Sequence, residues 1–210
     1  MGKIMRACEQ AGLKHSFMQG NGVFNANVFY YDYSDYQSFS WVNNAGVVSN
    51  EKASFKGLEL ELFLTPSESL DVLFNVSYTD AVVEDLEVAS GYFADTTPPF
   101  TPEYQASAML RYNWDAFEGN MAAQLSASYQ TETFHNARNY TAHEIDGYSV
   151  ADARLTWDDG EDKWHVAAYV DNLFDSDHEL IGFDVTGFYG TSQISYAKPR
   201  TYGVTIRRNF

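Results

Sequence analysis

The feature that most constrains the fold is a two-residue alternation of apolar and polar side chains that recurs along most of the chain. It is clearest in residues 69–79, where every second position from Leu70 to Tyr78 is apolar and the positions between are mostly polar. Successive side chains of a β-strand point to opposite faces of its sheet, so this pattern predicts a strand with one apolar and one polar face. No segment carries a persuasive helical period, and we therefore expect an all-β, antiparallel fold.

Period-two alternation predicts nine strands along the chain. Each is long enough for a tilted strand to cross a lipid bilayer, which takes about 9–11 residues. The predicted strands lie at roughly 10–18, 22–36, 53–64, 69–79, 103–114, 120–132, 147–157, 162–172 and 199–210.

The connections between these strands alternate between short turns and long loops. Because consecutive antiparallel strands turn back at opposite ends of a sheet, the long loops gather at one end. Short turns at one end and long loops at the other are typical of outer-membrane β-barrels. A soluble β-sandwich has less reason to place all its long loops together. The short turns lie at 19–21, 65–68, 115–119 and 158–161, and the long loops at about 37–52, 80–102, 133–146 and 173–198.

The last predicted strand carries its apolar face to the final residue of the chain. Tyr202, Val204, Ile206 and Phe210 share that face. Such a strand with a terminal aromatic residue fits a membrane barrel, in which every strand edge must be paired. Arg208 interrupts the apolar face near its end, where a long side chain can extend into the headgroup layer.

Composition excludes several other classes of protein. The 210 residues carry a formal net charge of −16, which argues against binding to nucleic acid. Aromatic residues make up 16% of the chain, which suits strands and the aromatic girdles of membrane barrels. No stretch approaches the roughly 20 apolar residues of a membrane helix, and residues 1–8 lack the apolar core of a secretory signal.

Several short stretches, in their order and spacing, resemble one family. From about Glu9 to Phe210 the chain resembles the C-terminal barrel region of TonB-dependent outer-membrane receptors, of the ferric-siderophore receptor type. The stretches that carry the resemblance are VFYYDYSDYQ (28–37), KGLELEL (56–62), TPE (101–103), YSVADARL (148–155), NLFD (172–175) and KPRTYG (198–203) with the terminal Phe210.

The resemblance implies a barrel of about 22 strands whose lumen is filled by an N-terminal plug domain. Its activity would be the energised uptake of a scarce ligand, with a ferric siderophore favoured and cobalamin or an oligosaccharide left open. It implies no enzyme activity and no cofactor. The expected location is the outer membrane of a Gram-negative bacterium. The expected partners are outer-membrane lipid, the barrel-assembly machinery and the small-molecule ligand, while the plug domain and TonB enter only through an N-terminal part that this sequence does not show.

The number of strands supports the interpretation as part of a larger barrel. Four turns and four loops leave the first strand starting at the loop end and the last strand finishing at the turn end. Single-chain bacterial barrels have even strand numbers, so nine strands indicate a C-terminal portion. We expect residues 9–210 to form this portion and residues 1–8 to be a non-family extension or chance start.

The long loops hold the candidate ligand-binding residues, because aromatic side chains with a few polar groups are the usual makeup of a binding site. The alternative is that these residues pack the loops together or form the upper aromatic girdle. By the resemblance, Tyr202, Val204, Ile206 and Phe210 would also form the signal for barrel assembly. The loop candidates are Tyr92, Phe93, Phe100, His135, Arg138, Tyr140, His143, Phe183, Phe188 and Tyr189.

No catalytic or metal-binding constellation emerges from the sequence. The five histidines have no convincing ligand spacing. An acidic cluster at Asp171, Asp175, Asp177 and Glu179 could bind calcium but lacks the spacing of an EF-hand loop, so solvated charge at a strand end is the favoured interpretation.

Charged residues within the predicted strands are assigned to the lumen. A Lys or Arg facing lipid at mid-bilayer costs about 2–4 kcal/mol, which decides the two faces. The residues assigned to the lumen are Glu59, Glu61, Arg111, Asp152 and Arg154.

Two other architectures are considered. A complete small barrel of about 8 or 10 strands would act as an adhesin or structural protein. A soluble β-sandwich enzyme or lectin would bury apolar faces between two sheets. An open nine-stranded sheet would leave two bare edges, so we expect the chain alone to aggregate or to need partner strands.

Overall fold

The computed structural model describes residues 5–42, 45–184 and 190–210. Within them lie two single-turn 3-10 helices, η1 (Met18–Gly20) and η2 (Thr141–His143), and neither is long or apolar enough to span a membrane. The strands are β1 (Met5–Phe17), β2 (Gly22–Val42), β3 (Ala45–Ser67), β4 (Leu70–Ala89), β5 (Tyr92–Thr96), β6 (Tyr104–Ala116), β7 (Gly119–Gln130), β8 (Thr133–Phe134), β9 (Glu144–Ile145), β10 (Tyr148–Asp158), β11 (Trp164–Asp171), β12 (Glu179–Asp184), β13 (Ser192–Tyr196) and β14 (Thr201–Arg208).

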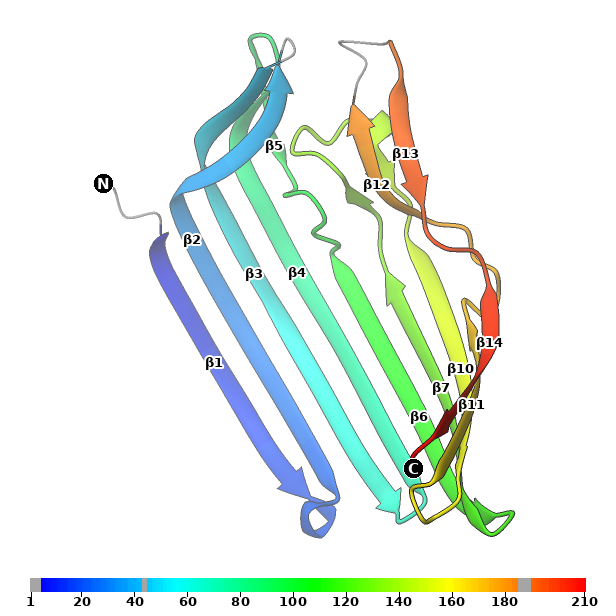
Figure 1. Ribbon diagram of the computed structural model, residues 1–210. Coiled ribbons are helices and arrows are strands. Elements are labelled where there is room, and N and C mark those ends of the chain that lie inside the picture. Colours follow the sequence, from blue (N-terminus) through cyan, green and yellow to red (C-terminus); the bar gives the residue numbers. More distant parts are fainter. Residues whose placement is uncertain (1–4, 43–44, 185–189) are drawn as a thin grey trace.

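One curved antiparallel sheet dominates the described residues (Figure 1). Its strand order is β1-β2-β3-β4-β6-β7-β10-β11-β14, with β5 paired to the upper part of β4. These nine main strands match the nine that the sequence predicts, so the all-β, antiparallel fold class is confirmed. The sheet is open in this structure, with β1 at one edge and β14 at the other.

The two ends of the sheet differ as the connection lengths predict. The β1–β2, β3–β4, β6–β7 and β10–β11 connections lie at the lower end in Figure 1, and the longer ones lie at the upper end. We call these the turn end and the loop end. The prediction that residues 37–52, 80–102, 133–146 and 173–198 are plain loops is wrong, because β2, β3 and β4 run far into them and β5, β8, β9, β12 and β13 lie within them. Pairing continues there because backbone N–H and C=O groups still need partners.

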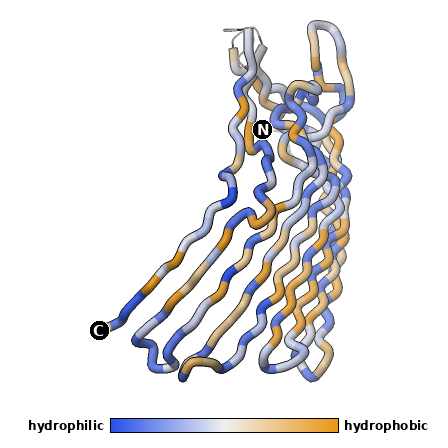
Figure 2. The backbone as a smooth tube through the Cα atoms, turned by 90° about the vertical axis from the view of Figure 1, so that its right-hand side faces the viewer, coloured by the Kyte–Doolittle hydropathy of each residue, from blue (hydrophilic) through white to orange (hydrophobic). Residues whose placement is uncertain are grey.

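The strand register separates an apolar face from a polar one. Leu62 pairs with Phe74, Phe74 with Ala108 and Ala108 with Ala127, which gives an apolar row across four strands. Hydrophobic positions recur along every main strand in Figure 2. Many of these side chains are open to the surroundings, including Leu110 at 47% and Leu125 at 48% exposed. Exposed apolar residues in continuous rows form a surface suited to lipid, and we call this the outer face.

The opposite, inner face carries the charged residues that the sequence assigns to the lumen. Glu61 pairs with Asn75, and Arg154 pairs with Gln124. The same register places Glu59, Arg111 and Asp152 on this face as well. The prediction that these charged residues share one face of the sheet is therefore confirmed, and their facing a lumen stays a prediction.

Aromatic residues border the apolar belt of the outer face at two levels. At the loop end the rings of Tyr78 and Tyr104 lie 5.0 Å apart, and at the turn end those of Tyr112 and Trp114 lie 5.8 Å apart. Trp114 follows Tyr104 by ten residues on β6, which at about 3.4 Å per residue and a tilt of about 40° spans about 26 Å. This matches the roughly 25 Å apolar band of outer-membrane barrels.

Beyond the belt, the loop end has a small hydrophobic core. Ala53, Val83, Leu86 and Ala137 are buried there, packed against the partly buried Tyr33, Tyr36 and Phe55. Burial, with a smaller contribution from neighbouring Tyr33, raises the pKa of Tyr36. Because Ala137 comes from the β8–β9 connection, this core holds that connection against the upper ends of the β2–β4 strands.

Candidate ligand-binding site

The segment 131–147, which joins β7 to β10, is tied to the β4–β6 region by hydrogen bonds. The Asn139 side chain accepts one from the Thr97 N–H (2.5 Å) and donates one to the Thr97 carbonyl (2.9 Å). The Tyr140 hydroxyl donates to the Val88 carbonyl, and the Phe100 N–H donates to the Phe134 carbonyl (2.9 Å). The segment is thus an ordered strap at the loop end.

Two histidines of this strap lie together. The rings of His135 and His143 are 4.5 Å apart, and His143 is only 3% exposed. The His143 ring contacts the Asn136 amide, and Tyr140 lies 5.7 Å from the same ring. Imidazole nitrogens can donate or accept hydrogen bonds, so this pair adds two polar rings to the strap.

The β12–β13 hairpin lies against His135. Gly182 of β12 has no side chain, and a Cβ there would clash with the His135 ring. The hairpin backbone therefore lies directly against the imidazole. Farther down, the ring of His178, just before β12, stacks on Tyr148 of β10 at 4.0 Å.

Arg138 adds a cation to the strap. Its backbone N–H donates to Asn136 Oδ1 (3.0 Å). Its Nε is buried and has no hydrogen-bond partner among the described residues. A buried donor without a partner is costly, so this guanidinium is placed to donate a hydrogen bond to an anionic or carbonyl oxygen of a ligand.

The structure brings only some of the predicted loop candidates together. His135, Tyr140 and His143 form one ring cluster in the strap. Arg138 lies in the same segment, where its backbone bonds the Asn136 side chain, and the Phe100 backbone is bonded to the strap's β8. Tyr92 and Phe93 begin β5, paired with Ala89 and Glu87, and remain exposed. Phe183 belongs to β12, but its side chain is not described, and Phe188 and Tyr189 lie outside the described residues.

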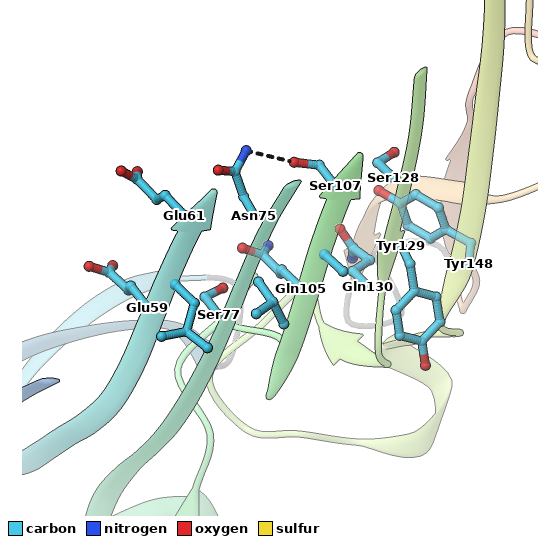
Figure 3. A pocket seen from close by; sticks show the side chains of 13 residues that line it. Glu59, Glu61, Asn75, Ser77, Gln105, Ser107, Ser128, Tyr129, Gln130 and Tyr148 are labelled. Atoms are coloured by element: carbon cyan, nitrogen blue, oxygen red, sulfur yellow. Dashed lines mark hydrogen bonds between the residues drawn. The ribbon is translucent and has the colours of Figure 1, made fainter. Parts of the chain in front are cut away.

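The inner face below the strap is lined by two rows of polar side chains (Figure 3). One row runs Asn25, Glu61, Asn75, Ser107, Ser128, and the other Asn27, Glu59, Ser77, Gln105, Gln130, Tyr148. Between them lies a hollow of about 360 Å³. The amide and hydroxyl residues of this wall were not singled out from the sequence, although they occupy the polar positions of the same alternation.

The two glutamates are the charged members of these rows. Asn25 donates to Glu61 (2.9 Å) and Asn27 donates to Glu59 (3.0 Å). Neither carboxylate forms an ion pair with a cation of the described residues. The wall therefore presents two negative charges beside a field of neutral hydrogen-bonding groups.

In the acidic cluster near β11 and β12, Asp175 forms contacts within the protein. Asp175 accepts from the Arg200 N–H (2.8 Å) and lies 3.8 Å from its guanidinium. Asn172 is 5% exposed with a φ of 53°, and its amide bonds Ser176 and Lys198. Among the described residues no group of three or more His, Cys, Asp or Glu could hold a metal ion.

A sheet with an apolar outer belt, a polar inner face and long structured connections at one end has the architecture of an outer-membrane β-barrel wall. The chain belongs to the TonB dependent receptor-like, beta-barrel family, whose model matches residues 10–173. Members of this family are outer-membrane receptors of Gram-negative bacteria, and they are transport proteins rather than enzymes. The resemblance drawn from the sequence is confirmed.

Individual relatives agree with this assignment. The chain is 27% identical over 191 residues to the pesticin receptor of Yersinia pestis, covering 90% of this chain and 27% of that protein. The ferric yersiniabactin uptake receptor FyuA from Yersinia pestis has a TM-score of 0.78 at 21% identity, with 97% of this chain and 29% of that chain covered. The ferric-catecholate import receptor Fiu from E. coli has a TM-score of 0.72 at 19% identity, with 97% and 27% covered.

The chain thus spans under a third of the length of the receptors that it matches. The division at residues 8 and 9 stays a prediction, although in the structure residues from Met5 onward already pair with β2.

Proposed function

We propose that this chain is the C-terminal portion of the barrel of a receptor that takes up a ferric siderophore across the outer membrane with energy supplied through TonB. The observation that carries the proposal is the strap, held above the polar inner face of a family barrel. It combines the ring cluster of His135, Tyr140 and His143 with the buried, unpartnered Nε of Arg138 in the same segment. This is the composition expected for an iron chelate with aromatic and anionic groups. The names of FyuA and Fiu favour the same ligand class over cobalamin or an oligosaccharide.

The direction of the edge strands supports a larger barrel. β1 and β14 both run from the loop end to the turn end (Figure 1). Direct pairing of these edges would create a parallel pair in an otherwise antiparallel sheet. An odd number of strands supplied by further sequence would close the barrel with antiparallel pairs throughout, whereas a small barrel closed by these nine strands alone would not.

The inner face and the last strand suit the remaining partners. A plug domain would meet the rows that contain Glu59 and Glu61, and cationic side chains of the plug would neutralise these carboxylates. Tyr202, Val204, Ile206 and Phe210, all highly exposed on the edge strand or just beyond it, would be read by the barrel-assembly machinery.

An uptake experiment tests the proposed function. The experiment measures uptake of a radiolabelled ferric siderophore by cells that express the complete protein, with and without TonB. The siderophore is chosen by screening catecholate and phenolate chelates. We expect TonB-dependent uptake, and we expect Arg138→Gln to weaken binding by about tenfold, the loss typical of one charge-assisted hydrogen bond. Lys163→Gln, an equal loss of charge at the turn end, serves as the matched control. Uptake that persists without TonB, or equal effects of the two variants, would contradict the proposal.

A further inference from the structure

A cation sits on the lipid-facing side of the last strand, at the turn end. Arg208 pairs with Trp164. The next pairs on the same face toward the loop end are Val166 with Ile206 and Ala168 with Val204. These pairs are apolar and belong to the outer face. Arg208 therefore continues a lipid-facing column, while its neighbour Arg207 points to the inner face opposite His165.

Two aromatic rings hold the guanidinium of Arg208. Its Cζ lies 4.9 Å from the centroid of the Trp164 ring and 4.8 Å from that of the Phe210 ring. Arg208 forms no ion pair with any carboxylate of the described residues. Rings that contact the faces of a guanidinium leave its in-plane N–H groups free to donate.

The position matches the depth of lipid headgroups. Trp157, at the turn-end border of the apolar belt, pairs with Val166. Arg208 and Trp164 lie two residues farther toward the turn end, or about 5 Å at about 3.4 Å per residue and a tilt of about 40°. Tryptophan prefers this interfacial layer, and the anionic groups of the layer are lipid phosphates.

We infer that Arg208, Trp164 and Phe210 form a binding site for the phosphate of a phospholipid in the leaflet at the turn end of the barrel. The guanidinium donates two N–H bonds to phosphate oxygens, and the two rings fix its orientation and contact the lipid chains. Arginine suits this role better than lysine because its planar fork matches phosphate geometry. The inference uses the membrane placement of the proposed function but not the identity of the transported ligand.

Lipid retention tests the site. The complete protein, purified in a mild detergent, is titrated with phosphatidylglycerol and observed by native mass spectrometry. We expect Arg208→Gln to weaken phosphatidylglycerol binding about fivefold, which is the contribution typical of one arginine near an anionic surface. The affinity of Arg208→Lys should lie between those of wild type and Arg208→Gln. Arg207→Gln removes the same charge one residue away on the inner face, and we expect it to leave binding unchanged.

Four further measurements identify the ligand and guard against misfolding. Diacylglycerol with the same chains should not bind, and inorganic phosphate should not displace the lipid. Equal weakening by Arg207→Gln and Arg208→Gln, or equal binding of diacylglycerol, would overturn the site, whereas displacement by inorganic phosphate would overturn the lipid as its ligand. Trp164→Leu keeps the charge and should still lower affinity about threefold by loss of the cation–π contact. Siderophore uptake by the same variants separates failure of this site from failure of the proposed function.

Discussion

Gly57 of β3 lies so close to the backbone of Tyr78 and the ring of Phe29 that a Cβ has no room there. A Cβ there would clash with the Tyr78 carbonyl and lie 2.5 Å from the Phe29 ring. We expect Gly57→Ala to lower the free energy of unfolding by about 1–3 kcal/mol, because the strands must separate or the ring must leave its rotamer. Gly12→Ala on β1 is the control, since its Cβ would meet Ala26 O at an ordinary 3.5 Å. Urea unfolding of the complete protein in detergent measures both variants, and equal stability would contradict this explanation.

The Asn139 side chain holds the strap against the β4–β6 region. Its amide bonds both backbone groups of Thr97, and its φ of 51° lies in the left-handed region. We expect Asn139→Ala to loosen residues 131–147, with faster proteolysis there and weaker ligand binding. Asn139→Gly also lacks the side-chain amide, but glycine adopts the left-handed backbone conformation without strain. We therefore expect it to destabilise the strap by about 1 kcal/mol less than Asn139→Ala. A strap equally protected in wild type and Asn139→Ala would show that these bonds are dispensable.

At the scale of the element, the β10–β11 turn is closed by one carboxylate. Burial would raise the pKa of Asp159, but backbone N–H groups of Trp164, Glu161 and Lys163 outweigh it and lower the pKa. The Glu161 and Lys163 N–H groups each donate to Asp159 Oδ1 at 3.1 Å. A lowered pKa in the folded state means that the ionised carboxylate stabilises the turn.

The stabilisation by Asp159 should therefore depend on pH. It is fully present above the ordinary aspartate pKa of about 3.9 and is lost as the pH falls through the lower pKa of the folded state. We expect Asp159→Ala to be less stable than wild type at neutral pH and equally stable in strong acid. Unfolding curves followed by tryptophan fluorescence across this range check it, with Glu68→Ala in the β3–β4 turn as control. A stability difference that persists unchanged in acid would exclude this explanation.

The elements also show how far the sequence could predict this structure. All nine main strands follow from alternation, because a bilayer on one side and a polar lumen on the other force two unlike faces. Beyond the belt this constraint ends, and β12 and β13 were expected to be loop. The strap was unpredictable for another reason: Asn139 and Thr97 are 42 residues apart, and nothing local marks them as partners. Ligand contact by any of the ten loop candidates, Phe183, Phe188 and Tyr189 among them, stays a prediction.

For the whole molecule, the unpaired edges are the main physical constraint. β1 and β14 expose backbone N–H and C=O groups beside an apolar belt, and neither lipid nor detergent can satisfy them. We expect the 210 residues expressed alone to aggregate in detergent, as measured by sedimentation. A monodisperse monomer, with or without detergent, would contradict this expectation.

The same edges decide between a large barrel and a small one in the complete protein. In a barrel closed by these strands alone, inward-facing Gly12 of β1 and Thr205 of β14 would lie on adjacent strands. With Cys8 replaced by serine, we expect cysteines at positions 12 and 205 to form no disulfide under mild oxidation, because other strands separate them. Cysteines at Ala167 and Thr205, which are paired in the sheet, should cross-link as a control. A disulfide between positions 12 and 205 within one monomer would restore the small barrel, and with it an adhesin or structural role in place of uptake.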